Sequence, residues 1–203
     1  MTSLLNECSL HGRIPENLKP KLIERLEGIC GTTTPVNVFE HEIGIVQTPE
    51  GARNDDLVLR LKSPLDENDL TKRNPDTTGH ALNVTVRRVI YAKIFNGDAL
   101  KFMSVLGYKY AYEYVKKGII FTFRDSLKIS IFQIFTLDKV HDVTSLKPFD
   151  DNNYIVEVAS ILAPSELVES KSQELISFRE TLKGVINLHR VNHLHLKNQI
   201  YYT

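Results

Sequence analysis

The most informative part of this sequence is residues 98–137, which read DALKFMSVLGYKYAYEYVKKGIIFTFRDSLKISIFQIFTL. Leu100, Met103 and Leu106 recur at helical spacing, and Gly107 follows them where a left-handed cap residue is usual. The segment is therefore predicted to begin with a short amphipathic helix.

From residue 108 onward the apolar residues recur with a spacing of two, which is typical of half-buried strands. Four tyrosines are predicted to share one face of the first strand: Tyr108, Tyr110, Tyr112 and Tyr114. The string KKG at 116–118 predicts a turn, and Asp125-Ser126 predicts a second one. Three consecutive strands joined by short turns predict an antiparallel meander.

The rest of the chain adds strands and helices on both sides of this meander. Further strands are predicted at 7–14, 36–47, 57–62, 82–95 and 154–162, and further helices after Asn17, the expected N-cap, and after Pro164. The tally of seven to nine strands and three helices predicts one mainly-β α+β domain over residues 1–203, with N-terminal, central and C-terminal helices. The polar segments 63–80 and 139–153 are expected to be mobile loops.

Composition excludes several functions. The 25 Lys and Arg residues equal the 25 Asp and Glu residues, so the chain lacks the positive field that binds nucleic acid, and we expect no direct sequence-specific DNA binding. Cys8 and Cys30 form no CxxC spacing and are expected to be buried thiols in a reducing compartment. The sequence shows neither an apolar run of about 18–20 residues nor a signal peptide, which predicts an intracellular, soluble protein without a membrane segment.

Several strings, in this chain order, resemble the family of Mediator head-module subunit 18. They are HG at 11–12, LIERLEGIC at 22–30, FEHEI at 39–43, LVLRLK at 57–62, GHAL at 79–82, EYVKKG at 113–118, LKI at 127–129, IFQIF at 131–135 and VASILAP at 158–164. The resemblance covers nearly the whole chain apart from the loops. Its most specific parts are EYVKKG, the LKI and IFQIF strand, and VASILAP.

The resemblance implies a curved antiparallel sheet closed into a barrel of about eight strands, like that of triphosphate-tunnel proteins, with flanking helices. It also implies a non-enzymatic coactivator scaffold in the nucleus that links regulators to RNA polymerase II and the general factors. The implied partners are Mediator subunit 20, as a heterodimer, and the C-terminal helix of subunit 8. The resemblance implies no catalytic residue, cofactor or metal.

The alternative is a divalent-metal-dependent triphosphate hydrolase of the tunnel-barrel type. Glu40 and Glu42 have the period-two spacing that a metal site in a barrel needs, and further charges could point inward. Those further candidates are Arg60, Lys62, Arg87, Lys128 and Glu157. Gly44 stands where the tunnel pattern would place a lysine, and Glu157 is not part of a second acidic pair, so mutually paired charges are the favoured interpretation.

Two other groups of residues are candidates for binding sites. The histidines of the C-terminal tail, His189, His193 and His195, have no nearby acid or cysteine and are expected to be solvated. The candidates for partner contacts are apolar residues that break one-sided strand patterns: Phe132, Ile134, Phe135, Tyr91 and Phe95.

Overall fold

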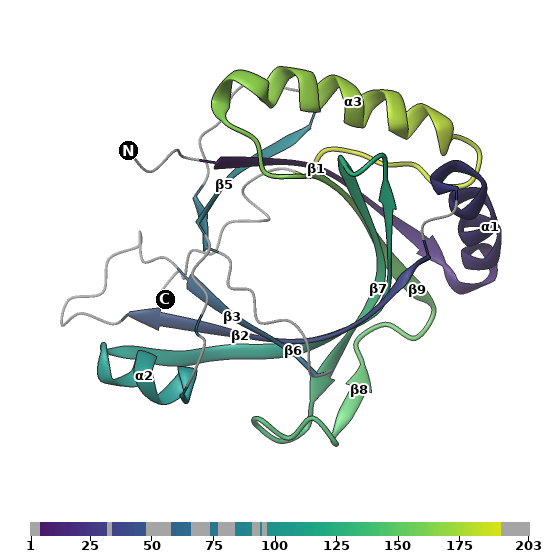
Figure 1. The fold of residues 1–203 in the computed structure, drawn as a ribbon. Coiled ribbons are helices and arrows are strands. Elements are labelled where there is room, and N and C mark those ends of the chain that lie inside the picture. The colour runs from purple at the N-terminus through teal and green to yellow at the C-terminus, as the bar shows by residue number, and fades with distance from the viewer. Residues whose placement is uncertain are drawn as a thin grey trace.

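The computed structural model describes residues 5–31, 34–47, 58–65, 74–76, 84–90, 94 and 97–191. Nine strands form one antiparallel sheet in the order β3-β2-β6-β7-β9-β1-β5-β4, and β8 pairs with β7 beside this path. The sheet curls around an interior, with α1 and α3 on its convex side (Figure 1). Within the described ranges no ladder joins β3 to β4, so the sheet is a curled half-barrel. This architecture confirms the predicted fold class.

The elements follow the alternation seen in the sequence. The strands are β1 (Leu5–Pro15), β2 (Val36–Gln47), β3 (Val58–Pro64), β4 (Asn74–Asp76), β5 (Thr85–Ile90), β6 (Tyr108–Phe123), β7 (Leu127–Leu137), β8 (Leu146–Pro148) and β9 (Asn153–Ser160). The α-helices are α1 (Lys19–Cys30), α2 (Ala99–Val105) and α3 (Val168–Thr181), and short 3-10 helices precede α1 (Glu16–Leu18) and α3 (Ser165–Leu167).

The predicted turn at 116–118 is wrong, because β6 continues through it as one strand of 16 residues. Gly118 pairs with Phe132 of β7, and a Cβ at this glycine would meet the Cα of Phe132 at 2.6 Å. The glycine therefore allows β7 to approach closely instead of reversing the chain. The second predicted turn is confirmed, since Arg124 and Asp125 both have φ 51° as in a type I′ hairpin.

The four tyrosines of β6 lie on two different faces. The β2–β6 ladder shifts register between Gly44, which pairs with Tyr112, and Ile45, which pairs with Tyr110. An advance of two residues along β6 thus corresponds to one residue along β2, and this extra residue in β6 makes a β-bulge. Paired residues share a face, whereas Gly44 and Ile45 point to opposite faces, so Tyr110 and Tyr112 do as well. The prediction of one shared tyrosine face is wrong for this reason.

The main hydrophobic core lies between the convex face of the sheet and the helices α1 and α3. The sheet contributes alternate residues, among them Leu10, Ile14, Phe121, Ile129, Ile131, Val156 and Val158. The helical side contributes Leu22, Leu26, Leu175, Phe178 and Leu182. Two layers thus bury the apolar face of the sheet, and the concave face is left for polar side chains.

Several predicted boundaries differ from the structure. Asn17 is not the N-cap of α1, because a 3-10 turn precedes the helix and Leu18 takes the cap position without a side-chain hydrogen bond. Segment 139–153 contains β8, which pairs with β7. Of segment 63–80, residues 66–73 and 77–80 lie outside the described residues, as do much of the predicted strand 82–95 and the tail from 192.

Cys8 is buried, and burial raises the pKa of its thiol to about 11. Cys30 is half-buried, and burial raises its pKa too. Both are free cysteines. No helix in the described part of the chain has the length and apolar character required to cross a membrane.

Candidate functional site

The concave face gathers charged residues from six strands. Four carboxylates face four cationic side chains there, together with one histidine. They are Glu7 and His11 on β1, Glu40 and Glu42 on β2, Arg60 and Lys62 on β3, Arg87 on β5, Lys116 on β6, and Glu157 on β9. Because alternate residues of a strand point to one face, the period of two that places apolar residues on the convex side places these charges inside.

Glu42 is fully buried and is held by three cations. Its carboxylate oxygens lie 3.1 Å from Arg60 Nη1, 2.6 Å from Lys62 Nζ and 3.3 Å from Lys116 Nζ. Burial would raise the pKa of Glu42, but Lys116, Lys62 and Arg60 together outweigh burial and hold that pKa well below its usual range. Tyr114 also donates a hydrogen bond to Glu42. This carboxylate is therefore charged and compensated by the three cations.

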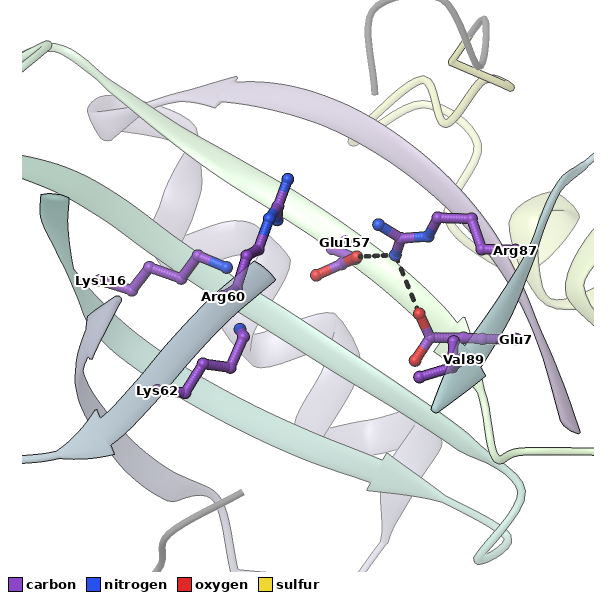
Figure 2. Close-up of a pocket in the computed structure, with 7 residues that line it drawn as sticks. All are labelled: Glu7, Arg60, Lys62, Arg87, Val89, Lys116 and Glu157. Atoms are coloured by element: carbon purple, nitrogen blue, oxygen red, sulfur yellow. Dashed lines mark hydrogen bonds and ion pairs between the residues drawn. The ribbon is translucent and has the colours of Figure 1, made fainter. Parts of the chain in front are cut away.

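A second group of charges lies on the opposite wall. Arg87 Nη2 donates to Glu7 Oε1 at 2.9 Å and to Glu157 Oε1 at 3.2 Å, and His11 Nε2 lies 3.3 Å from Glu157 Oε1. Figure 2 shows Arg87 between the two carboxylates, with Arg60, Lys62 and Lys116 across the pocket from them. The interior therefore joins two ion-pair clusters on facing walls.

The two carboxylates that the hydrolase alternative would use to bind a metal ion already share a lysine. Lys62 Nζ lies 2.9 Å from Glu40 Oε1 as well as 2.6 Å from Glu42 Oε2, so one cation bridges both carboxylates. A divalent ion would have to displace that lysine before it reached either oxygen. The paired arrangement favoured by the sequence is the one that the structure contains.

Aromatic rings fill the space beside Glu42. Tyr112 and Tyr114 stack with ring centroids 6.1 Å apart and planes 7° from parallel. A Cβ at Gly44 would meet carbons of the Tyr112 ring at 2.6 Å, so the glycine leaves room for that ring. The ring of Tyr112 therefore occupies the space that a lysine side chain at position 44 would need.

Four of the five further candidates for inward charges line the pocket: Arg60, Lys62, Arg87 and Glu157. Lys128 lies on β7, where its ladder partners are Thr122 and Ala159, and it is not among the pocket-lining residues. The sequence reasoning missed Lys116, because a turn was placed there. It also missed Glu7 and His11, although the alternation along β1 contained a signal for both.

The candidate partner residues have different environments. Phe132 is 7% exposed, and Lys116 Nζ lies 5.2 Å from the centre of its ring, so it is packed inside this chain. Ile134 and Phe135 are half-buried. Their neighbour Phe149 is 74% exposed, and its amide donates to the carbonyl of Ile134. Tyr91 and Phe95 lie outside the described residues.

The fold and its interior define a class: a curled antiparallel sheet, covered by helices on its convex side, whose inward charges pair with one another. Comparison with known proteins narrows this class. A sequence profile of the family described as Med18 protein matches residues 70–197, more than half of the chain. The chain belongs to the Med18 protein family.

Similar proteins occur across animals and plants. The Xenopus tropicalis protein named Mediator of RNA polymerase II transcription subunit 18 is 22% identical to this chain, and the match covers 92% of this chain and 88% of the relative. The Drosophila melanogaster protein of that name is 26% identical, and the match covers 94% of this chain and 88% of the relative. The Arabidopsis thaliana protein of that name is 27% identical, and the match covers 90% of this chain and 85% of the relative.

Solved structures match the fold. A chain in the Schizosaccharomyces pombe Mediator head module matches with a TM-score of 0.75 at 19% identity, over 92% of this chain and 98% of that one. A Pyrococcus horikoshii protein matches with a TM-score of 0.62 at 17% identity, over 94% of this chain and 97% of that one. At these identities the likeness shows the fold alone.

Proposed function

We propose that this protein is a non-enzymatic subunit of the Mediator head module that acts in the nucleus as a scaffold between regulators and RNA polymerase II. Its family and the names of its relatives support this role, as does the fold shared with a chain of the fission yeast head module. The proposed partners are subunit 20, as a heterodimer, and a C-terminal helix of subunit 8. Contact with RNA polymerase II and the general factors is then indirect.

The observation that carries the non-enzymatic proposal is the ion-pair network of the interior, in which each carboxylate already has a cationic partner. Glu40 and Glu42 share Lys62, and Glu7 and Glu157 share Arg87. Triphosphate hydrolysis needs carboxylates that are open to a metal ion and cations that are open to phosphate. Here the carboxylates and the cations are paired with each other, so neither set is free for a metal ion or a phosphate.

A phosphate-release assay tests this proposal against the hydrolase alternative. Purified protein with Mg²⁺ or Mn²⁺ and nucleoside or RNA triphosphates is expected to release no phosphate above a buffer blank. Turnover that disappears in Glu40→Ala would refute the non-enzymatic proposal, because it would assign the release to this site rather than to a contaminating phosphatase.

Apolar surface outside the core offers places for the partners. Three side chains at the end of α2 are exposed: Phe102 at 55%, Val105 at 83% and Leu106 at 49%. The β7–β8 edge carries Ile134, Phe135 and the exposed Phe149. Neighbouring exposed apolar side chains are typical of protein contact surfaces. Tyr91 and Phe95 remain predicted contacts.

Co-expression with subunits 8 and 20 tests the assembly. We expect Ile134→Asp to reduce capture of the subunit 8 helix at least about tenfold, because a charge placed in an apolar contact loses at least about 1.4 kcal/mol of binding free energy. Val36→Asp is the matched control, since Val36 is 63% exposed near the start of β2. Equal capture by both variants, with unchanged circular dichroism, would remove the β7–β8 edge as the docking site.

A further inference from the structure

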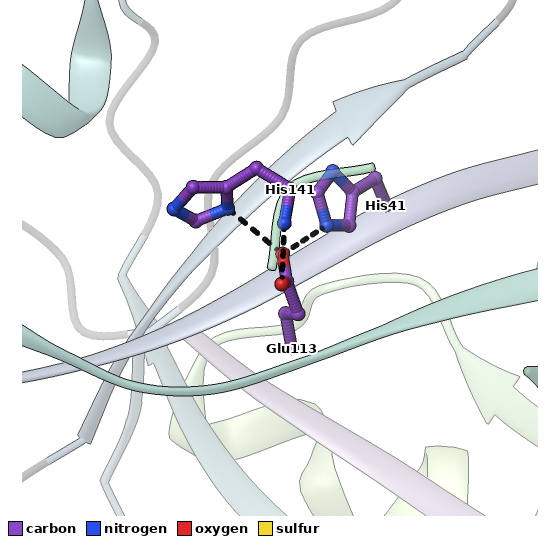
Figure 3. A group of neighbouring side chains, drawn as sticks. All are labelled: His41, Glu113 and His141. Carbon is purple, nitrogen blue, oxygen red and sulfur yellow. Dashed lines mark hydrogen bonds and ion pairs between the residues drawn. The ribbon is translucent and has the colours of Figure 1, made fainter. Parts of the chain in front are cut away.

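A second cluster of ionisable groups lies apart from the interior network. The carboxylate of Glu113 on β6 lies between two imidazoles (Figure 3). One belongs to His41 on β2, and the other belongs to His141 in the turn between β7 and β8. His41 shares its face of β2 with Ile43 and Ile45, the face opposite to Glu42. The cluster therefore lies outside the curled interior.

The donor atoms already lie close to the spacing of a metal coordination sphere. His41 Nε2 is 2.8 Å from Glu113 Oε2, and His141 Nδ1 is 2.9 Å from the same oxygen. The three ligand atoms lie within 4.8 Å of one another. Tetrahedral zinc with bonds of about 2.0–2.1 Å holds its ligand atoms about 3.3 Å apart. To admit the ion, each imidazole nitrogen would have to move a few tenths of an ångström away from the carboxylate oxygen.

Among the described residues, no lysine or arginine forms an ion pair with Glu113. Its side chain is 3% exposed, and among the described residues its ion pairs are with the two histidines. Glu42, by contrast, is surrounded by one arginine and two lysines. A buried carboxylate is costly unless a positive charge compensates it. A divalent cation held between Glu113 and the imidazoles would supply that charge.

The turn that carries His141 is fixed in position. His141 has φ 64°, a left-handed conformation that residues with a side chain rarely adopt. Its backbone N–H donates to Glu113 Oε1 at 2.7 Å, and the Tyr110 ring packs edge-on against its imidazole with centroids 5.5 Å apart. The backbone amide thus holds one carboxylate oxygen while the other oxygen faces both imidazoles. This arrangement pre-positions the three ligands.

We propose that His41, Glu113 and His141 form a binding site for a borderline divalent transition-metal ion, of which Zn²⁺ is the representative. Two imidazole nitrogens and one carboxylate oxygen are a donor set that suits zinc and not magnesium or calcium, which take oxygen ligands. The His141 side chain is 42% exposed, so water can complete the coordination on that side. The ion would fasten the β7–β8 turn to the β2–β6 ladder.

Zinc titration of the full chain, expressed without a polyhistidine tag and freed of metal with a chelator, tests the proposal. Isothermal calorimetry with ZnCl2 measures affinity and stoichiometry, and the visible spectrum with Co²⁺ reports the geometry. Three variants are compared with the parent: His141→Asn, Glu113→Gln and the tail variant His189→Gln/His193→Gln/His195→Gln. Asparagine keeps the left-handed backbone at 141 accessible while it removes the imidazole.

The expected result is one zinc ion per chain and a tetrahedral cobalt spectrum in the parent and in the tail variant. His141→Asn and Glu113→Gln should each lower zinc affinity at least about 100-fold, because loss of outer-shell partners alone costs about 10–100-fold. Circular dichroism checks that each variant is folded. Absence of zinc binding in the parent, equal affinity in His141→Asn, or loss confined to the tail variant would each overturn the proposal.

Discussion

Glu42 and Glu40 are neighbours on the same face of β2, yet their environments differ. Glu42 is fully buried among three cations, whereas Glu40 is 25% exposed and shares one lysine. Removing the charge of Glu42 takes away the carboxylate that lies within 3.3 Å of Arg60, Lys62 and Lys116. Breaking a buried pair from one side is far more costly than breaking an exposed one.

Glu42→Gln is therefore expected to lower the free energy of unfolding by about 3–5 kcal/mol at pH 7, because it removes the negative charge that three cationic side chains share. Glu40→Gln is the matched control and should cost no more than about 1 kcal/mol. Urea unfolding followed by circular dichroism measures both. Similar small losses in the two variants would mean that the interior network contributes little to stability.

Glu157 links the interior to the pH dependence of stability. Burial would raise its pKa, but the hydrogen bond from His11 and the charges of Arg87, His11 and Lys116 hold the pKa well below 4.5. A carboxyl whose pKa is lower in the folded state stabilises that state above its unfolded pKa. This contribution is lost as the pH falls through the lower, folded value.

We therefore expect the free energy of unfolding to fall as the pH decreases below 4.5, the ordinary value for this group, and to fall less steeply in Glu157→Gln. Urea unfolding of both proteins at a series of pH values from neutral downward measures the two slopes. If the curves ran parallel, Glu157 would not carry the acid sensitivity.

At the level of strands, the β6–β7 pair depends on one glycine. Gly118 sits in the middle of β6 opposite Phe132, and an added Cβ would meet both the backbone of Ile131 and the Cα of Phe132. Backbone atoms of a central strand have little room to move aside. Any side chain at this position must push the two strands apart.

Gly118→Ala is accordingly expected to destabilise the protein by about 1–3 kcal/mol or more through overpacking. Gly28→Ala in α1 is the control, since nothing lies within 4 Å of an added Cβ there. That substitution should raise stability by about 0.5–1 kcal/mol, because alanine favours helices over glycine. Thermal unfolding of both variants distinguishes them, and an unchanged midpoint in Gly118→Ala would contradict the close approach.

The short helix α2 packs one side against the sheet and leaves other apolar side chains exposed. Asp98 caps it by accepting a hydrogen bond from the Lys101 amide at 3.0 Å. Leu100 and Met103 pack against the small cluster of Ile43, Ile45 and Leu61. Leu106, predicted on the same buried face, is instead 49% exposed because the helix ends at Val105.

At the level of the molecule, the curled sheet separates three kinds of surface. The helices α1 and α3 cover the convex face (Figure 1). The concave face holds paired charges, and the end near α2 exposes apolar side chains. The proposed scaffold role needs such a division, because the core must be complete while an apolar surface stays free for a partner.

Val105→Asp is expected to weaken the proposed pairing with subunit 20 about tenfold or more while it leaves thermal stability unchanged, since the side chain is 83% exposed in the isolated chain. Ile161→Asp, at a site 50% exposed after β9, is a control on another part of the surface. Size-exclusion chromatography of the co-expressed pair reads out the complex. Undiminished pairing in Val105→Asp would exclude α2 from that interface.

Local patterns in the chain were enough for much of this fold. Side chains alternate along a strand and repeat at helical spacing along a helix, so each period can be recognised without knowledge of what packs beside it. This is why β2, β7, β9 and the two long helices were predicted, and why Arg60, Lys62, Arg87 and Glu157 were expected inside. The family resemblance rested on strings of the same kind.

Contacts between distant segments decided the rest. The string at 116–118 has the composition of a turn, and the close approach of β7 to Gly118 is what keeps it extended and directs Lys116 inward. The β-bulge opposite Gly44 and Ile45, which divides the tyrosines, exists only in the paired ladder. His41, Glu113 and His141 come together although 72 and 28 residues separate them, because strand register and a reversed turn fix positions that no local pattern encodes.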